Sequence, residues 1–235
     1  MFYKLTNSSE LETIEEEFSR KHNFPNLYKS KTILNGLKEV TVSIITAQDP
    51  DQINHAIWGL LPKDFDDDWK SYQSVDNTLN INLDKVDASD ELYYNALTTN
   101  RCIVITSGFF TSRLHEGKLF PYHVHLKDHR PFGIAGVYNM LEDGFITCSI
   151  LITKANRAFE NIPNLSKNKP LVFKNGDFSK WLDTSKSYQD QMPLIQNHET
   201  LEFLSYPIKE EFYRDSGVYD TIIESADYYD ILRTS

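Results

Sequence analysis

Short apolar runs of strand length, separated by polar residues, glycine and proline, most constrain how this chain can fold. Residues Val40–Thr46 alternate between apolar and polar side chains and are rich in β-branched residues, which predicts a strand. The runs Cys102–Thr106, Phe145–Thr153 and Leu201–Ile208 predict further strands, and the apolar run Ala56–Pro62 stops at its proline. With 235 residues, 40% of them apolar, the chain can bury these runs in one core.

Two strand-like runs, Tyr122–Leu126 and Phe132–Tyr138, flank the polar residues Lys127–Pro131. This arrangement is typical of a β-hairpin, in which a short turn joins two paired strands. A Gly-Phe-Phe sequence at residues 108–110 follows the predicted strand Cys102–Thr106. We expect it to form an aromatic turn at the end of that strand.

The predicted helices are few and short. Ser9 and Glu12 have the spacing of a capping box, which predicts a helix from there to about Lys21. Its apolar residues recur at helical spacing on one face. One short helix is expected at about residues 155–160 and another near Asp177, a plausible N-cap. The last twenty residues are acidic and rich in tyrosine and suggest a docked helix. The pattern as a whole predicts one α+β domain over residues 1–235.

Several classes of protein are disfavoured by what the sequence lacks. It has no apolar stretch long enough to span a membrane and no secretory signal. Its two cysteines, Cys102 and Cys148, lie in apolar runs and are predicted to be buried thiols without a metal. His123 and His125 share one face of a strand, but no third ligand is apparent, so we expect a surface or half-buried pair. The four acids between residues 64 and 68 are interpreted as a solvated loop. We therefore expect a cytoplasmic protein with no cofactor and no metal.

The charge is unevenly distributed. There are 24 basic and 34 acidic residues, a net charge of −10, which as a whole argues against a nucleic-acid binder. Residues 113–180, however, hold 10 basic and 6 acidic residues and four of the seven histidines. A mildly basic centre within an acidic chain is one reading, and ordinary surface variation is the other.

Six segments, taken in order, resemble one known family, the SRAP (SOS response-associated peptidase, or abasic-site processing) proteins. The segments are Trp58–Pro62, Leu79–Asp84, Arg101–Phe110, Pro121–Tyr138, Ile150–Asn156 and Lys169–Val172. They cover about residues 56–175, and Tyr206–Ile208 resembles the family's last strand. The resemblance implies a single SRAP-like domain with a mixed or antiparallel, barrel-like sheet and short flanking helices.

The family's chemistry depends on four positions that act together. A cysteine at residue 2 supplies a thiol and an α-amine, which close a thiazolidine on the aldehyde of an abasic site in single-stranded DNA. A glutamate and a histidine transfer protons, and an asparagine helps to hold the adduct. The resemblance implies peptidase or hydrolase activity and a role in the SOS response to DNA damage.

Only one of these four positions keeps its residue in this chain. Asn80 matches the asparagine, but Phe2 stands at the cysteine position and Thr111 at the glutamate position. The histidine position falls on Pro163 or Ser166, depending on where a gap is placed. Because residues that act as a unit lose most of the rate when one is removed, we expect a catalytically impaired member, a pseudoenzyme. Whether any activity survives is left open.

The first functional hypothesis is that the chain still binds single-stranded or abasic DNA without a covalent adduct. Trp58 and Trp69 could stack on bases, although core packing is the default for each. Asn80 and Asn82 are candidate polar contacts, and Asn82 stands where the family has an arginine. The candidate phosphate contacts are the cations Arg113, Lys118, Arg130, Lys167 and Lys169. The second is a non-catalytic scaffold that binds an unknown protein partner through its acidic segments. A surviving Schiff-base enzyme, acting through Met1 or a lysine, ranks last. We expect a monomer with no membrane association.

Overall fold

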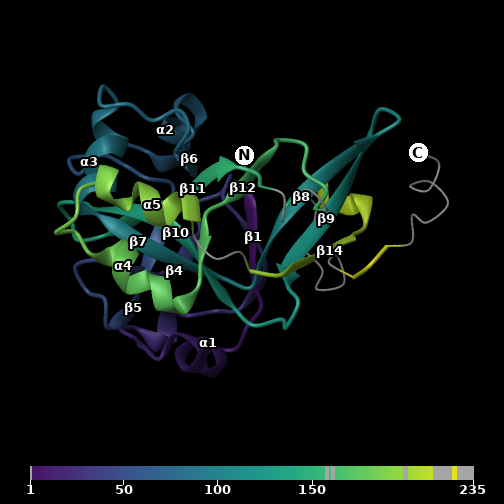
Figure 1. Ribbon diagram of the computed structural model, residues 1–235, viewed down its shortest axis with the longest axis horizontal. Helices are drawn as coiled ribbons and strands as arrows, with labels where there is room; N and C mark the ends of the chain where they lie inside the picture. Colours follow the sequence, from purple (N-terminus) through teal and green to yellow (C-terminus); the bar gives the residue numbers. More distant parts are fainter. Residues whose placement is uncertain (1, 157–158, 160–161, 198–200, 214–223, 227–235) are drawn as a thin grey trace.

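The computed structural model describes residues 2–156, 159, 162–197, 201–213 and 224–226, and its described strands form two sheets (Figure 1). The smaller sheet is antiparallel and has the order β14-β9-β8-β1-β3. Its strands are β14 (Phe203–Pro207), β9 (Lys118–Leu126), β8 (Gly108–His115), β1 (Lys4–Asn7) and β3 (Lys31–Asn35). The β8–β9 hairpin extends away from the body of the molecule at the upper right of Figure 1.

The larger sheet has the order β12-β11-β10-β7-β4-β5-β2, with β13 added on β10 and β6 on β11. Its strands are β12 (Asn168–Pro170), β11 (Ile146–Lys154), β10 (Phe132–Met140), β7 (Arg101–Thr106), β4 (Thr41–Thr46), β5 (Gln52–Trp58), β2 (Lys21–His22), β13 (Val172–Phe173) and β6 (Asn80–Asn82). Strand β11 also pairs with β5 in parallel. Strands β11, β10, β7, β4 and β5 therefore close into a ring, and the fold is mixed α+β, as expected.

Short helices flank the larger sheet (Figure 1). They are α1 (Leu11–Phe18), α2 (Trp69–Val75), α3 (Glu91–Thr99), α4 (Phe178–Leu182) and α5 (Met192–Asn197), with 3-10 turns at Pro25–Leu27, Asn175–Asp177, Gln189–Gln191 and Glu210–Tyr213. The predicted capping box is wrong, because the N-cap of α1 is Glu10 and no side chain caps it. Asp177 is the N-cap of α4, but its carboxylate binds the Lys180 ammonium at 2.7 Å instead of a backbone N–H.

The described core consists of two main clusters, one on each face of β7. Cys102 and Val104 belong to the cluster that includes Leu5 and Phe109 of the smaller sheet, while Ile103 and Ile105 belong to the cluster beneath the helices. Both faces of β7 are thus buried, which explains why its sequence is continuously apolar rather than alternating. The two cysteines are free and fully buried, as predicted, and burial raises the pKa of both thiols.

The predicted hairpin of Tyr122–Leu126 with Phe132–Tyr138 is wrong. Strand β9 pairs with β8 and β14, whereas β10 pairs with β7, β11 and β13. The polar segment between them carries the chain from one sheet to the other, which a local sequence pattern does not distinguish from a tight turn. The Gly-Phe-Phe sequence at residues 108–110 likewise begins β8 and is not a turn.

Other sequence predictions map directly onto the structure. The strands predicted from Val40, Cys102, Phe145 and Leu201 correspond to β4, β7, β11 and β14. The helix expected at residues 155–160 and the one expected in the last twenty residues fall largely outside the described residues. Among the residues that are described, no helix has the length and apolar character needed to cross a membrane.

Candidate functional site

A groove of about 650 Å³ lies where the start of β1 meets β8. Its walls come from five parts of the chain: residues 2–4, Leu37, residues 110–112 of β8, the loop residues 164–166, and residues 212–213. Three of the four positions expected from the family chemistry lie in or beside it, namely Phe2, Thr111 and the Pro163–Ser166 segment. The topology thus brings together residues that are more than 100 positions apart in the sequence.

Asn80, on β6, holds the backbone of residue 2. Its Oδ1 accepts a hydrogen bond from the Phe2 N–H at 2.9 Å, and its Nδ2 donates to the Phe2 carbonyl at 2.8 Å. Asn80 is 8% exposed, so both bonds are shielded from water. The parallel pairing of β6 with β11 fixes Asn80 opposite Ile150 in the larger sheet. This asparagine therefore anchors the chain end beside the groove.

The ring of Phe2 is packed into the core. It is 2% exposed and meets the ring of Phe109 edge-on, with centroids 5.5 Å apart. Phe109 in turn stacks on Phe159 at 6.0 Å and contacts Phe132 and Phe203 edge-on. Such edge-to-face pairs favour burial beyond their area alone. Position 2 therefore contributes an apolar anchor to this cluster and no nucleophile.

Thr111 is buried on β8, and its hydroxyl donates a hydrogen bond to the Pro163 carbonyl. Ser166 lies three residues after Pro163 in the same loop. Its Oγ donates a hydrogen bond to Asn164 Oδ1 at 3.0 Å and accepts one from the Asn168 N–H at 3.3 Å. The loop is tied to β8 by the bond from the Leu165 N–H to the Ser112 carbonyl at 3.0 Å. Both alternatives for the histidine position thus lie beside Thr111, and neither carries a titratable group.

The described residues that line the groove include no cysteine, histidine, aspartate or glutamate. The one charged side chain among them is Lys4, whose ammonium donates to the Phe212 carbonyl at 2.8 Å and lies 4.2 Å from the centroid of the Phe212 ring. Side chains of this kind bind and orient a ligand by stacking and hydrogen bonding. Among these described residues no side chain supplies a thiol, a carboxylate or an imidazole, which are the groups expected from the family chemistry.

The two tryptophans proposed as stacking platforms are buried. Trp58 is fully buried, and its indole N–H donates to the Leu79 carbonyl at 2.9 Å. Trp69, at the start of α2, is 7% exposed. Neither ring is exposed enough to stack on a base. Both are packed in the core, which was the default expectation for each. An apolar run around Trp58 cannot by itself distinguish these two roles.

The candidate polar contacts are dispersed. Arg130 forms ion pairs with Glu17 of α1 at 2.6 Å and with Asp128 at 2.8 Å, and it does not line the groove. Lys169 on β12 is 5% exposed, and burial lowers the pKa of its ammonium to about 8. Asn82 lies two residues beyond Asn80 on β6 and accepts a hydrogen bond from the Asp84 N–H at 3.1 Å.

Two of the candidate cations directly follow wall residues, and a third lies on the strand paired with β8. Arg113 follows Ser112 on β8, whereas Lys118 is exposed at the start of β9, where it pairs with His115 near the tip of the β8–β9 hairpin. Lys167 is exposed and follows Ser166 in the loop, with a left-handed φ of 55°. Charged residues of both signs adjoin the lining, since Lys38 follows Leu37 and Glu211 precedes Phe212. Of the proposed nucleic-acid contacts, Arg113 and Lys167 lie next to lining residues in the sequence.

Some groove residues carried no sequence signal. Tyr3 and Leu37 are 38% and 55% exposed, and Tyr213 is 44% exposed while its hydroxyl donates to Ser112 Oγ at 2.7 Å. The C-terminal region is rich in tyrosine, but nothing in the local sequence connects residue 213 with β8. Long-range packing alone places these aromatic and apolar groups at the groove.

The histidines on β9 are buried rather than at the surface, which corrects that expectation. His123 and His125 are 6% and 5% exposed and stack with centroids 5.5 Å apart, and His129 stacks on His125 at 4.3 Å. His123 Nδ1 lies 2.9 Å from the Tyr206 hydroxyl, and burial lowers the pKa of His123 to about 3. No group of three potential metal ligands is found among the described residues, those at positions 64–68 included.

Sequence comparison gives a decisive match. The family described as SOS response associated peptidase (SRAP) matches residues 1–213. The chain belongs to the SRAP family. Abasic site processing protein YMR114C of Saccharomyces cerevisiae is 27% identical to it over 160 residues, which are 66% of this chain and 41% of that protein. The chain thus matches about two fifths of the length of this curated relative.

Two solved structures show the same SRAP fold. A protein from Bacteroides thetaiotaomicron has a TM-score of 0.81 at 23% identity, covering 96% of this chain and 100% of its own. A protein from Bordetella bronchiseptica has a TM-score of 0.69 at 15% identity, covering 88% of this chain and 99% of its own. At these identities the likeness establishes the fold.

Proposed function

We propose that this SRAP protein binds abasic or other single-stranded DNA in the groove beside residue 2 without forming a covalent adduct. The observation that carries the proposal is the composition of the groove. Asn80 still holds the backbone of residue 2, while the described lining contains no thiol, imidazole or carboxylate. The family relationship supports DNA as the ligand, and the residues present support recognition without covalent chemistry.

Thiazolidine formation needs an amine and a thiol that reach the same carbon, and both must belong to residue 2. Phe2 has no thiol, and its ring is directed onto Phe109 in the core. The Thr111 hydroxyl donates to the Pro163 carbonyl and does not ionise near neutral pH. Among the described lining residues, no carboxylate or imidazole is therefore present to carry the proton transfers that ring opening of the abasic sugar requires.

The same groove offers features that bind an unpaired nucleotide. Exposed aromatic groups at Tyr3 and Tyr213 can stack on bases, and each such contact is worth about 1–3 kcal/mol. Lys167 adjoins one wall segment and Lys118 lies on the strand paired with β8, and both can pair with phosphates. Because the chain carries a net charge of −10, we expect weak binding that falls steeply as salt rises.

The test compares two readouts on one oligonucleotide carrying a single abasic site. Fluorescence anisotropy at low and moderate salt is expected to show binding, and a denaturing gel is expected to show no protein–DNA band. The variant Lys118→Gln/Lys167→Gln should weaken binding, while the matched control Lys63→Gln/Lys70→Gln, which removes the same charge from exposed sites elsewhere, should not. A band that survives denaturation, or no binding at either salt, contradicts the proposal.

A non-catalytic protein-binding role is the second candidate. The mainly apolar groove lining and the acidic net charge favour it. Arg130 also forms ion pairs with Glu17 and Asp128, so its charge is already neutralised within the protein. Affinity capture with the intact protein distinguishes the two roles. A stable protein partner that is retained after nuclease treatment, with no oligonucleotide binding, would support this second role.

A further inference from the structure

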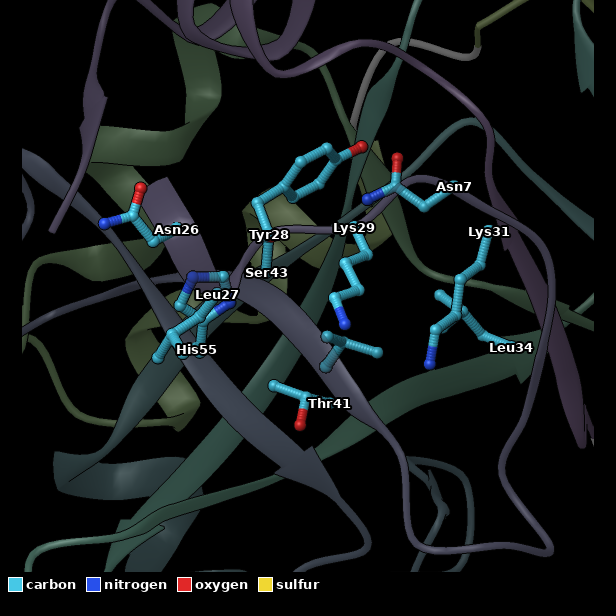
Figure 2. Close-up of a pocket in the computed structure, with 11 residues that line it drawn as sticks. Asn7, Asn26, Leu27, Tyr28, Lys29, Lys31, Leu34, Thr41, Ser43 and His55 are labelled. Atoms are coloured by element: carbon cyan, nitrogen blue, oxygen red, sulfur yellow. The ribbon is translucent and has the colours of Figure 1, made fainter. Parts of the chain in front are cut away.

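A second pocket lies at the opposite end of β1 from the groove (Figure 2). It has a volume of about 280 Å³ and is bounded by Asn7 at the end of β1, by β3, by the segment 26–29, and by β4 and β5. This is slightly below the roughly 300–1,000 Å³ of pockets that take drug-sized ligands, so the space fits a small molecule. None of the four positions of the family chemistry lines it.

The charge in this pocket is of one sign. Lys29 and Lys31 both line it, and none of its lining residues is acidic. In Figure 2 the two side chains extend in the same direction, toward the side of the pocket that holds Thr41. Lys21, Lys127 and Lys180 each pair with a carboxylate, but within the described part of the chain neither Lys29 nor Lys31 does. Two ammonium groups with no carboxylate partner among the described residues therefore border one hollow.

A buried polar group without a partner faces the same space. Asn7 is 4% exposed, and its Oδ1 has no hydrogen-bond partner. Figure 2 shows its amide group between Tyr28 and the two lysines. Leaving such a group unpaired costs about 1–3 kcal/mol, and exchanging the amide oxygen and nitrogen still leaves one polar end toward the pocket. A ligand with a hydroxyl group could satisfy this amide.

We propose that the pocket binds a small phosphate monoester, with Lys29 and Lys31 on the phosphate and the Asn7 amide on a hydroxyl of the attached sugar. Lysine ammonium groups pair with a phosphate dianion as point charges, and the Thr41 hydroxyl adds a donor on the same side. The phosphate can belong to a free sugar phosphate or to the terminus of a DNA strand. This site is separate from the groove and does not rest on the proposed function.

Isothermal titration of the full chain tests the site with ribose 5-phosphate, ribose and inorganic phosphate as probes. We expect saturable binding of ribose 5-phosphate, weaker binding of inorganic phosphate and none of ribose. The variant Lys29→Gln/Lys31→Gln should weaken ribose 5-phosphate binding about tenfold or more. Asn7→Ala should weaken ribose 5-phosphate more than inorganic phosphate, since the amide contacts the sugar.

The control is Lys63→Gln/Lys70→Gln, which changes the net charge equally and should bind as the parent does. Because Lys29 and Lys31 are exposed, their variant should keep the parent's unfolding temperature. Oligonucleotides with a 5′-phosphate and a 5′-hydroxyl distinguish the two sources, and a lysine-dependent preference for the phosphate identifies a DNA terminus. Equal binding of ribose and ribose 5-phosphate, or equal loss in both double variants, would overturn the proposal.

Discussion

The side-chain amide of Asn80 and the backbone of Phe2 form a closed pair of hydrogen bonds across 78 positions of the sequence, at 2.9 and 2.8 Å. The pair fixes where the chain enters β1 and satisfies both polar groups of residue 2. It links β6, which belongs to the larger sheet, to the groove wall, so a single side chain sets the position of residue 2 relative to the body of the fold.

Replacing this amide should destabilise the protein. Asn80→Ala leaves the Phe2 N–H and carbonyl buried without partners, and we expect a loss of about 2 kcal/mol in the free energy of unfolding. Urea denaturation measures it. Asn82→Ala is the matched control, since among the described residues the Asn82 side chain accepts a hydrogen bond from the local Asp84 N–H alone, and it should cost well under half as much. Equal losses would mean that the two bonds to Phe2 contribute little.

Restoring two of the three missing groups should restore covalent capture. We expect the parent chain to give no adduct with abasic single-stranded DNA, while Phe2→Cys/Thr111→Glu, prepared with cysteine as its first residue, forms a band on a denaturing gel. The same change removes a buried ring from the cluster around Phe109, so it should cost about 3 kcal/mol. Phe2→Ser/Thr111→Glu is the control without a thiol. An adduct formed by that control would show that the thiol is not the deciding group.

Arg101 is predicted to be essential for stability although it binds no carboxylate side chain among the described residues. It is fully buried at the start of β7 and donates to the Trp181 carbonyl at 2.7 Å, to the Leu97 carbonyl at 2.9 Å and to the Asp183 carbonyl. Arg101→Leu strips these carbonyls of donors and should cost about 3 kcal/mol in urea denaturation. Arg20→Leu, at a less buried arginine that also donates to carbonyls, should cost below about 1 kcal/mol.

Acid should weaken the fold through His123. Burial, helped by the neighbouring His125 and His129, lowers the pKa of His123 to about 3, below its ordinary value of 6.5. Between these two values the unfolded chain binds the proton and the folded chain does not. Above pH 6.5 His123 is neutral in both states and does not reduce the free energy of unfolding. As the pH falls below 6.5 the free energy of unfolding decreases, by about 2 kcal/mol between pH 7 and pH 5.

Denaturant titrations at several pH values measure this slope. His123→Asn retains a hydrogen-bonding atom near the Tyr206 hydroxyl but does not titrate, so its stability should fall less between pH 7 and pH 5. The pKa of Glu15 lies below its ordinary value of 4.5, outside this pH interval: burial would raise the pKa, but hydrogen bonds from the His22 backbone and from Lys21 lower it. An unchanged slope in His123→Asn would assign the acid sensitivity to other groups.

Local patterns sufficed for those parts of the fold that local forces decide. Strands such as β4 and β7 follow from their β-branched, apolar residues, and α4 begins at the residue expected to cap it. The partners of β9 and β10 could not be predicted, because pairing depends on residues such as Tyr206, which is 83 positions from His123. The helices α2 and α3 were not predicted either, since both are short and only partly apolar.

The candidate site shows the same division. The resemblance to the SRAP family was enough to identify Phe2, Asn80 and Thr111 as residues of one site. The burial of Trp58, Trp69 and Lys169 could not be read from residue type, because aromatic and basic side chains occur both in cores and at surfaces. The approach of Tyr213 to Ser112, across 101 positions, likewise depends on how the whole chain packs.

The parallel contact of β11 with β5 has a consequence for how this protein can vary. A circuit of strands bonded to one another holds most of the central core, and none of those five strands contributes a lining residue to the groove. The exposed side chains along the groove, unlike the buried Phe2, can therefore be exchanged while the scaffold stays intact. In such an architecture, loss of chemistry and loss of fold are separate events.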